Sequence, residues 1–139
     1  MDNLEGIIQK LKEDKGQESF SLTCKTVVSE IQKLSFPSTA IKPLLLFMCE
    51  NPNLDYGMPG AFVQFIESFP EDVYVDDLIQ TIQRQPTEHN TWMLLRIMNT
   101  WNSPRQNEYI AVMKHALSHP NISKELQEEL KEDLEDLEE

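Results

Sequence analysis

Glycine is scarce in this chain, since only four of its 139 residues are glycine. Sites that cradle phosphate or hold a nucleophile on a strained turn depend on glycine, because the backbone there comes close to the ligand or takes a positive φ. The sequence contains no phosphate-binding glycine loop, no Gly-x-Ser-x-Gly turn and no His-Glu-x-x-His motif. We therefore expect a protein that is not an enzyme and that carries no cofactor.

Cysteines and long apolar runs are also few. Cys24 and Cys49 are the two cysteines, and we expect both to be reduced, buried in helices and without a disulfide. The longest strongly apolar run, residues 44–49, is far shorter than the ~20 residues that a membrane-spanning helix needs. Residues 1–5 lack the basic and apolar regions of a secretory signal. We expect a cytoplasmic protein without a membrane segment.

Basic residues are outnumbered two to one. Twelve lysines and arginines stand against 24 aspartates and glutamates, which gives a net charge of −12. Residues 51–85 hold one basic and six acidic side chains (−5), and residues 121–139 hold two basic and nine acidic side chains (−7). A field of this sign repels nucleic acid and anionic membranes and accelerates the encounter with basic partners.

Prolines, in contrast, recur at regular intervals. Six of them are separated by 15, 18, 16, 18 and 16 residues, and these are Pro37, Pro52, Pro70, Pro86, Pro104 and Pro120. Proline ends a helix because its ring clashes with the preceding turn and it has no N–H to donate. The rhythm predicts short helices that fold back on one another, with about 34 residues per pair, the scale of a helical-hairpin repeat.

Apolar residues at helical spacing place about eight helices between these prolines. No segment alternates with period two, so no sheet is expected. The fold class that we predict is all-α, with short antiparallel helices forming a HEAT- or TPR-like stack or a compact bundle. One domain is expected over residues 1–139. The expected helices cover residues 4–11, 24–34, 38–48, 62–69, 75–82, 87–101, 104–117 and 123–137.

Three of these helices carry further signals. The sixth is apolar nearly all round, with Trp92 and Trp101 expected in the core, and should therefore be central. Ser103 is the expected N-cap of the seventh, with a reciprocal Gln106. The eighth has a face of leucines that is expected to pack on the preceding helix. Its opposite, acidic face is either simply solvated or attracts a basic partner. Its acidic end, residues 135–139, opposes the helix dipole and should fray.

Two fragments resemble metal sites. The run Asn51–Asp55 copies the first ligand spacing of an EF-hand loop, but the glycine and glutamate that must follow are Tyr56 and Phe62. His115 and His119 are four residues apart on the seventh helix, near enough to chelate a metal, but that helix offers no nearby third ligand. We expect a turn at the first fragment and no metal at either.

A longer stretch resembles a known family. It comprises the turn Glu50–Gly60, the segment 62–67, and Arg84–Asn99 with its Pro-Thr helix start and its Trp-Met-Leu-Leu-Arg-Ile-Met-Asn run. These residues, about a third of the chain, are similar to small acidic immunity proteins encoded beside bacterial polymorphic or contact-dependent growth-inhibition toxins. The resemblance implies an all-helical cytoplasmic inhibitor without catalytic activity. Its partner would be the C-terminal domain of a cognate toxin, basic and in many cases a nuclease, bound as a monomer in a 1:1 complex.

The acid-rich region 51–85 is the expected contact surface. Tyr56 is expected to be an exposed aromatic anchor in its loop. Arg96 either pairs with Glu67 or Asp55, which would lock the fold, or contacts the toxin. The alternative function is a helical-repeat adaptor that binds a peptide or protein partner. The predicted toxin-binding residues are Asp55, Tyr56, Glu67, Glu71, Asp72, Asp76 and Asp77.

Overall fold

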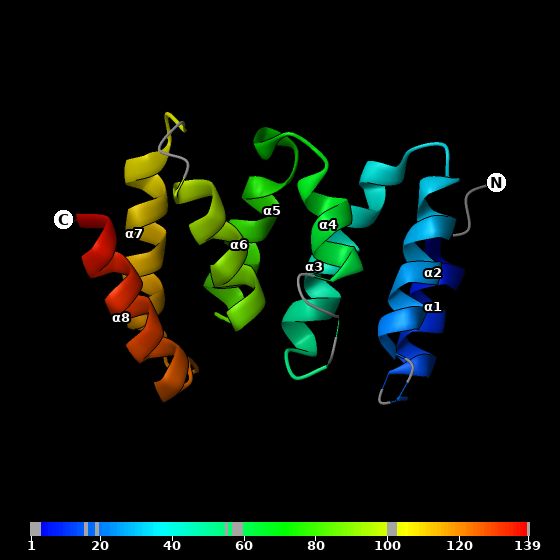
Figure 1. Cartoon of the computed structure of the whole chain (residues 1–139), viewed down its shortest axis with the longest axis horizontal. Helices are drawn as coiled ribbons and strands as arrows, with labels where there is room; N and C mark the ends of the chain where they lie inside the picture. The colour runs from blue at the N-terminus through cyan, green and yellow to red at the C-terminus, as the bar shows by residue number, and fades with distance from the viewer. Residues whose placement is uncertain are drawn as a thin grey trace. The chain divides into compact units, whose positions relative to one another are not determined.

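The computed structural model describes residues 4–15, 17–18, 20–54, 56, 60–99 and 103–138, with side chains to residue 136. Within these ranges the chain is all-α, as the sequence predicts, and holds eight α-helices, one 3₁₀ turn (η1) and no strand. The repeat-like arrangement of the helices stays a prediction. The elements are α1 (Leu4–Asp14), α2 (Phe20–Gln32), η1 (Pro37–Ala40), α3 (Ile41–Glu50), α4 (Ala61–Glu67), α5 (Glu71–Arg84), α6 (Glu88–Met98), α7 (Gln106–Leu117) and α8 (Lys124–Glu138) (Figure 1).

The chain divides into two compact units, and the single domain over residues 1–139 stays a prediction. The first unit is Met1–Tyr74 and the second is Val75–Glu139, so the boundary falls inside α5.

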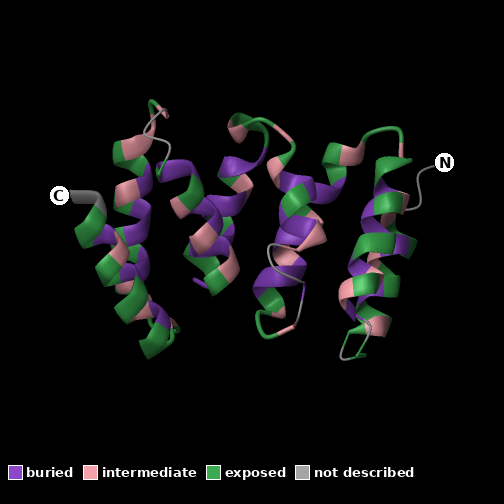
Figure 2. Ribbon diagram, viewed as in Figure 1, coloured by how far each residue is buried: buried purple, intermediate pink, exposed green. Residues whose placement is uncertain are grey.

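In the first unit, α2 contacts both α1 and α4 (Figure 1). The side chains that meet there are the apolar stripes read from the sequence, since one face of each helix is buried and the other is exposed (Figure 2). Both cysteines are buried in helices, as predicted, and they are not joined in a disulfide. The residues of this core with no exposed surface include Leu11, Cys24, Val27, Ile31, Leu44, Phe62, Val63 and Ile66.

In the second unit, α7 packs against α6 and α8. Met93 and Met98 of α6 and Tyr109 and Met113 of α7 have no exposed surface. Polar side chains close the helix ends around this core. Gln127 Nε2 of α8 donates to the carbonyl oxygen of Leu117 at 2.8 Å.

The start of α6 is fixed by a reciprocal pair of hydrogen bonds. The backbone N–H of Asn90 donates to Thr87 Oγ1 (3.1 Å), and the backbone N–H of Thr87 donates to Asn90 Oδ1 (2.8 Å). Asn90 Nδ2 also donates to the carbonyl oxygen of Gln85 (2.9 Å). Thr87 and Asn90 are both buried. The pair satisfies N–H groups that a helix start otherwise leaves without a partner.

The join between α6 and α7 differs from the sequence prediction. Helix α6 ends at Met98, before residue 101, and α7 begins at Gln106 instead of residue 104. Ser103 Oγ accepts from the backbone N–H of Arg105 (3.2 Å), and Gln106 does not return a bond to Ser103 as predicted. Gln106 Nε2 donates instead to the carbonyl oxygen of Met98 (3.0 Å), because this tertiary acceptor lies within its reach.

Helix α6 is also less enclosed than its composition suggests. Trp92 is half-buried and Arg96 is exposed, so one edge of the helix faces solvent. The prediction that Trp101 lies in the core falls outside the described residues. None of the described helices combines the length and the apolar character that crossing a bilayer requires.

Replacing Thr87 by alanine should lower the free energy of unfolding by about 1–2 kcal/mol, because a buried helix N-cap is lost. Urea denaturation measures this change. Thr26→Ala is the matched control, since Thr26 is an exposed threonine inside α2, and it should change stability by less than about 0.5 kcal/mol. Equal losses for the two variants would contradict a capping role for Thr87.

Candidate acidic interface

The first turn of α5 carries two acidic residues, Glu71 and Asp72. Carboxylates are favourable there because the unpaired N–H groups at a helix start leave a partial positive charge. Asp72 is exposed and Glu71 is half-buried. Glu71 and Asp72 therefore stabilise the start of α5, and this role accounts for two of the acidic residues of region 51–85 without any need for a binding function.

Further along α5, Asp76 pairs with Arg105, the residue that precedes the first residue of α7. Arg105 Nη2 lies 2.8 Å from Asp76 Oδ1, and the same guanidinium also pairs with both carboxylate oxygens of Glu108. It lies 5.4 Å from the centre of the Tyr109 ring. The two carboxylates raise the pKa of Arg105, with the hydrogen bond to Glu108 as the larger cause. The negative charge of Asp76 is thus partly neutralised inside the protein.

The remaining predicted carboxylates are placed as follows. Glu67, near the end of α4, is half-buried, as is Asp77 of α5. Asp55 lies outside the described residues. Of the seven predicted contact residues, four lie on α5 (Glu71, Asp72, Asp76 and Asp77), and of these Asp72 and Asp76 are exposed.

The prediction that Tyr56 is an exposed anchor is wrong. Only 2% of its surface is accessible. Its ring lies 5.7 Å from the ring centres of both Phe20 and Phe62, and 6.3 Å from that of Phe47. The Tyr56 hydroxyl donates to the carbonyl oxygen of Asn51 at 2.7 Å. The tyrosine thus fixes its own loop to α2, α3 and α4 and offers no surface to a partner.

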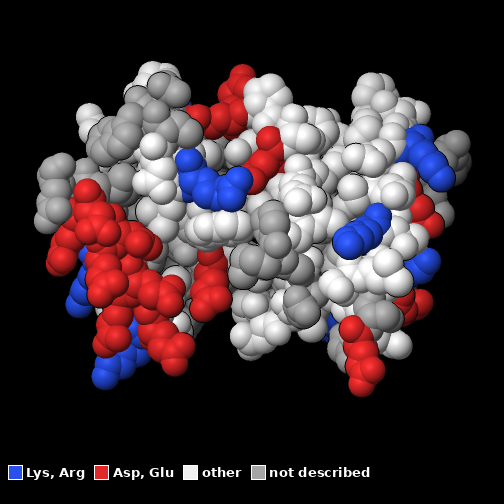
Figure 3. Space-filling view, in the orientation of Figure 1, with Lys and Arg blue, Asp and Glu red and all other residues white. Residues whose placement is uncertain are grey.

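Helix α8 carries a denser acidic face than α5. Leu126, Leu130 and Leu134 are buried and recur every four residues, which confirms the predicted docking face. On the opposite side, the exposed residues Glu125, Glu129, Glu132 and Asp136 follow spacings of 4, 3 and 4. Such spacings place them in one row along about 17 Å of helix. Figure 3 shows carboxylates gathered over α8. None of these four has an ion-pair partner among the described residues.

The pKa of Asp133, at the edge of this row, is affected by the neighbouring negative charges. Burial raises its pKa, and the neighbouring carboxylates Asp136 and Glu132 raise it further. The predicted contact set contains no residue of α8. The signal that could have found this row was the leucine register, because it determines which acidic side chains share the solvent face.

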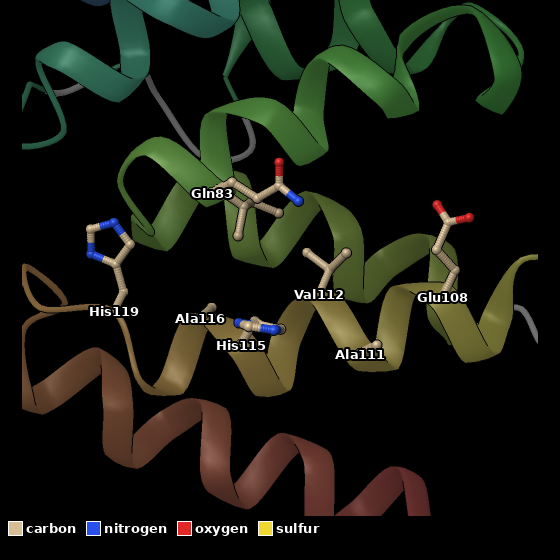
Figure 4. A pocket seen from close by; sticks show the side chains of 8 residues that line it. Gln83, Glu108, Ala111, Val112, His115, Ala116 and His119 are labelled. Carbon is tan, nitrogen blue, oxygen red and sulfur yellow. The ribbon is translucent and has the colours of Figure 1, made fainter.

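His115 of α7 and His119, two residues past the end of that helix, line a cleft of about 340 Å³ in the second unit. Its lining includes the apolar side chains of Ile82 of α5 and Val112 of α7. Figure 4 shows Val112 and His115 on α7 and His119 in the segment that follows this helix. His119 Nδ1 accepts from the backbone N–H of Asn121 at 3.0 Å, so that nitrogen is occupied. No group of three histidine, cysteine or acidic side chains able to hold a metal ion occurs in the described part of the chain.

Arg96 lies on the open edge of α6. Its guanidinium carbon is 4.9 Å from the ring centre of Trp92, a distance at which a cation interacts with the face of an indole. Arg96 therefore has a structural contact on its own helix. The predicted pairing of Arg96 with Glu67 or Asp55 stays a prediction.

No protein-family model, curated protein or solved structure matches this chain.

The phenol of Tyr56 should make stability sensitive to high pH. Burial raises its pKa above the usual value of 10.0, so the unfolded chain loses this proton at a lower pH than the folded chain does. The stabilisation is therefore complete below about pH 10 and is lost as the pH rises further. Tyr56→Phe should flatten the decline in the free energy of unfolding between about pH 9.5 and about pH 12. Urea titrations across this range test it, and parallel declines in the two proteins would contradict it.

Proposed function

We propose that this protein is an immunity protein that binds and neutralises the toxin domain encoded beside it, through its acidic surface and without catalysing a reaction. The partner is a basic domain of the kind that binds nucleic acid, met in the cytoplasm as a 1:1 complex. The observation that carries the proposal is the row of solvent-facing carboxylates on α8. The sequence resemblance of the 50–99 region to immunity proteins supports the same reading.

The α8 row has the charge and the accessibility that a basic partner requires. The carboxylates of Glu125, Glu129 and Glu132 are exposed. The charge of Asp76 on α5, in contrast, is partly neutralised by its ion pair with Arg105. We therefore assign the larger share of attraction to α8. Asp72 and Asp77 of α5 remain candidate contacts, and Tyr56 is no longer one.

Charge and packing would play different roles in such a complex. The acidic surface sets the rate of encounter, because attraction acts before contact and weakens with salt. Residence time depends on buried anchors at the interface. A nuclease active site is basic because it holds phosphate, so a carboxylate row can occupy it or block the approach of substrate.

Protection in cells tests the function directly. The toxin domain of the neighbouring gene is co-expressed with this chain, and growth is compared with and without it. Growth arrest that is relieved only when this chain is present supports inhibition. Arrest that persists despite equal expression would exclude it, and the helical-repeat adaptor would then become the better interpretation.

Reversing the charge of the α8 row should slow association. The variant Glu125→Lys, Glu129→Lys and Glu132→Lys keeps good helix formers at exposed positions, so α8 should remain folded. We expect the association rate constant with the toxin domain at low salt to fall at least about tenfold, and its salt dependence to weaken. Stopped-flow mixing at several salt concentrations measures both.

A matched control separates the row from net charge. Glu5, Glu13 and Glu18 are exposed in the first unit, and changing all three to lysine alters the net charge by the same amount. This control should retain most of the association rate. Asp72→Lys with Asp77→Lys tests the α5 contribution in the same assay. Equal slowing by the α8 variant and the control would remove the assignment to α8.

A further inference from the structure

The first unit holds a groove whose chemistry is opposite to that of the acidic surface. It measures about 650 Å³ and lies between α1 and α3. Ile8 of α1 and Pro43 and Leu46 of α3 are half-exposed along it, with the buried Phe47 beneath. These side chains form a small apolar floor in a concave surface, the shape in which ligands bind.

Lysines surround this apolar floor. Lys12 and Lys15 come from the end of α1 and Lys42 from the start of α3, and all three line the groove and are exposed. The first unit has six basic residues in all (positions 10, 12, 15, 25, 33 and 42), so half of them meet here. Among the described residues that line the groove, Glu50 is the single carboxylate. The groove is therefore a locally positive site in a protein of charge −12.

The lysines differ in how firmly they are held. Lys15 Nζ lies 3.4 Å from Asn51 Oδ1, a contact that bridges α1 to the residue that follows α3 at one end of the groove. Neither Lys12 nor Lys42 has an ion-pair partner among the described residues. Two ammonium groups on opposite walls are thus available to a ligand, and their alkyl stems extend the apolar floor.

We propose that this groove binds an acidic amphipathic helix of a protein partner. The apolar face of that helix lies on Ile8, Pro43 and Leu46, and carboxylates on its two flanks reach Lys12 and Lys42. This arrangement is the helix-in-groove mode of recognition, with the charges choosing the partner and its orientation. The site does not depend on the proposed toxin interface, since it lies on other residues and prefers ligands of the opposite charge.

The charge pattern argues against two other occupants. A second copy of this chain would have to bring its acidic α8, but the leucines of α8 are already buried in their own unit and two molecules of charge −12 repel each other. Nucleic acid is a poor ligand for the groove despite its three lysines. The floor of the groove is apolar and the surrounding protein surface is acidic, and both disfavour the binding of a phosphate backbone.

A pair of labelled peptides tests the proposal on the full chain. The acidic probe is a fluorescein-labelled helical peptide of about 16 residues, with leucines at helical spacing and glutamates on both flanks. The basic probe has lysine in place of each glutamate. Fluorescence anisotropy with the whole protein should show saturable binding of the acidic probe. Its affinity should fall at least about tenfold in Lys12→Glu with Lys42→Glu.

Two further variants separate local charge from packing and from net charge. Lys12→Met with Lys42→Met keeps the apolar stems and should also weaken binding of the acidic probe. Lys10→Glu with Lys25→Glu changes two exposed lysines that are not among the lining residues given for the groove and should leave the affinity within about twofold. Circular dichroism confirms that each variant retains its helices.

Three results would overturn the inference. The first is saturable binding of the basic probe with equal affinity. The second is an affinity for the acidic probe that is unchanged in the Lys12 and Lys42 variants. The third is that dodecanoate binds at these lysines while the acidic probe does not, which would assign the groove to a small amphiphile and not to a protein helix.

Discussion

Burial of one leucine row determines how α8 presents its charge. Because Leu126, Leu130 and Leu134 pack on one side of the helix, every acidic residue of the opposite register faces solvent. A row of like charges on one helix face is destabilising on its own. The packing of the three leucines offsets this repulsion between carboxylates. The position and direction of the acidic face therefore follow from packing, and no charged residue of α8 needs a specific partner to hold it.

The few basic residues are placed unevenly around this acidic background. Arg105 forms ion pairs with Asp76 and Glu108 of the same chain. These ion pairs reduce the negative charge that α5 presents to a partner. Lys12 and Lys42 lie instead on the walls of an apolar groove. The protein thus separates surfaces of opposite chemistry in different parts of the chain, and one molecule could engage an acidic and a basic partner at separate sites.

The helices could be predicted from the sequence because their signals are local. The stripe of α8 repeats within one segment, and Thr87 and Asn90 cap a helix from three residues apart, so periodicity and capping rules suffice. The environment of Tyr56 could not be predicted in this way. Its burial requires Phe20, which lies 36 residues earlier, and neighbouring turn residues and acids favour exposure. Tyr56 was wrongly placed in the candidate contact set for this reason, because tertiary contacts decide which side chains remain exposed.

The elevated pKa of Asp133 links the acidic helix to protons and to cations. Burial, and then repulsion from Asp136 and Glu132, makes the ionised form of Asp133 costly in the folded chain, so protonation of Asp133 in acid stabilises the folded chain at this position. Any cation that settles beside the row gives the same relief and lowers this pKa again. A positively charged partner that binds along the row would therefore favour the ionised form of Asp133, and it would be held less tightly where acid protonates this side chain.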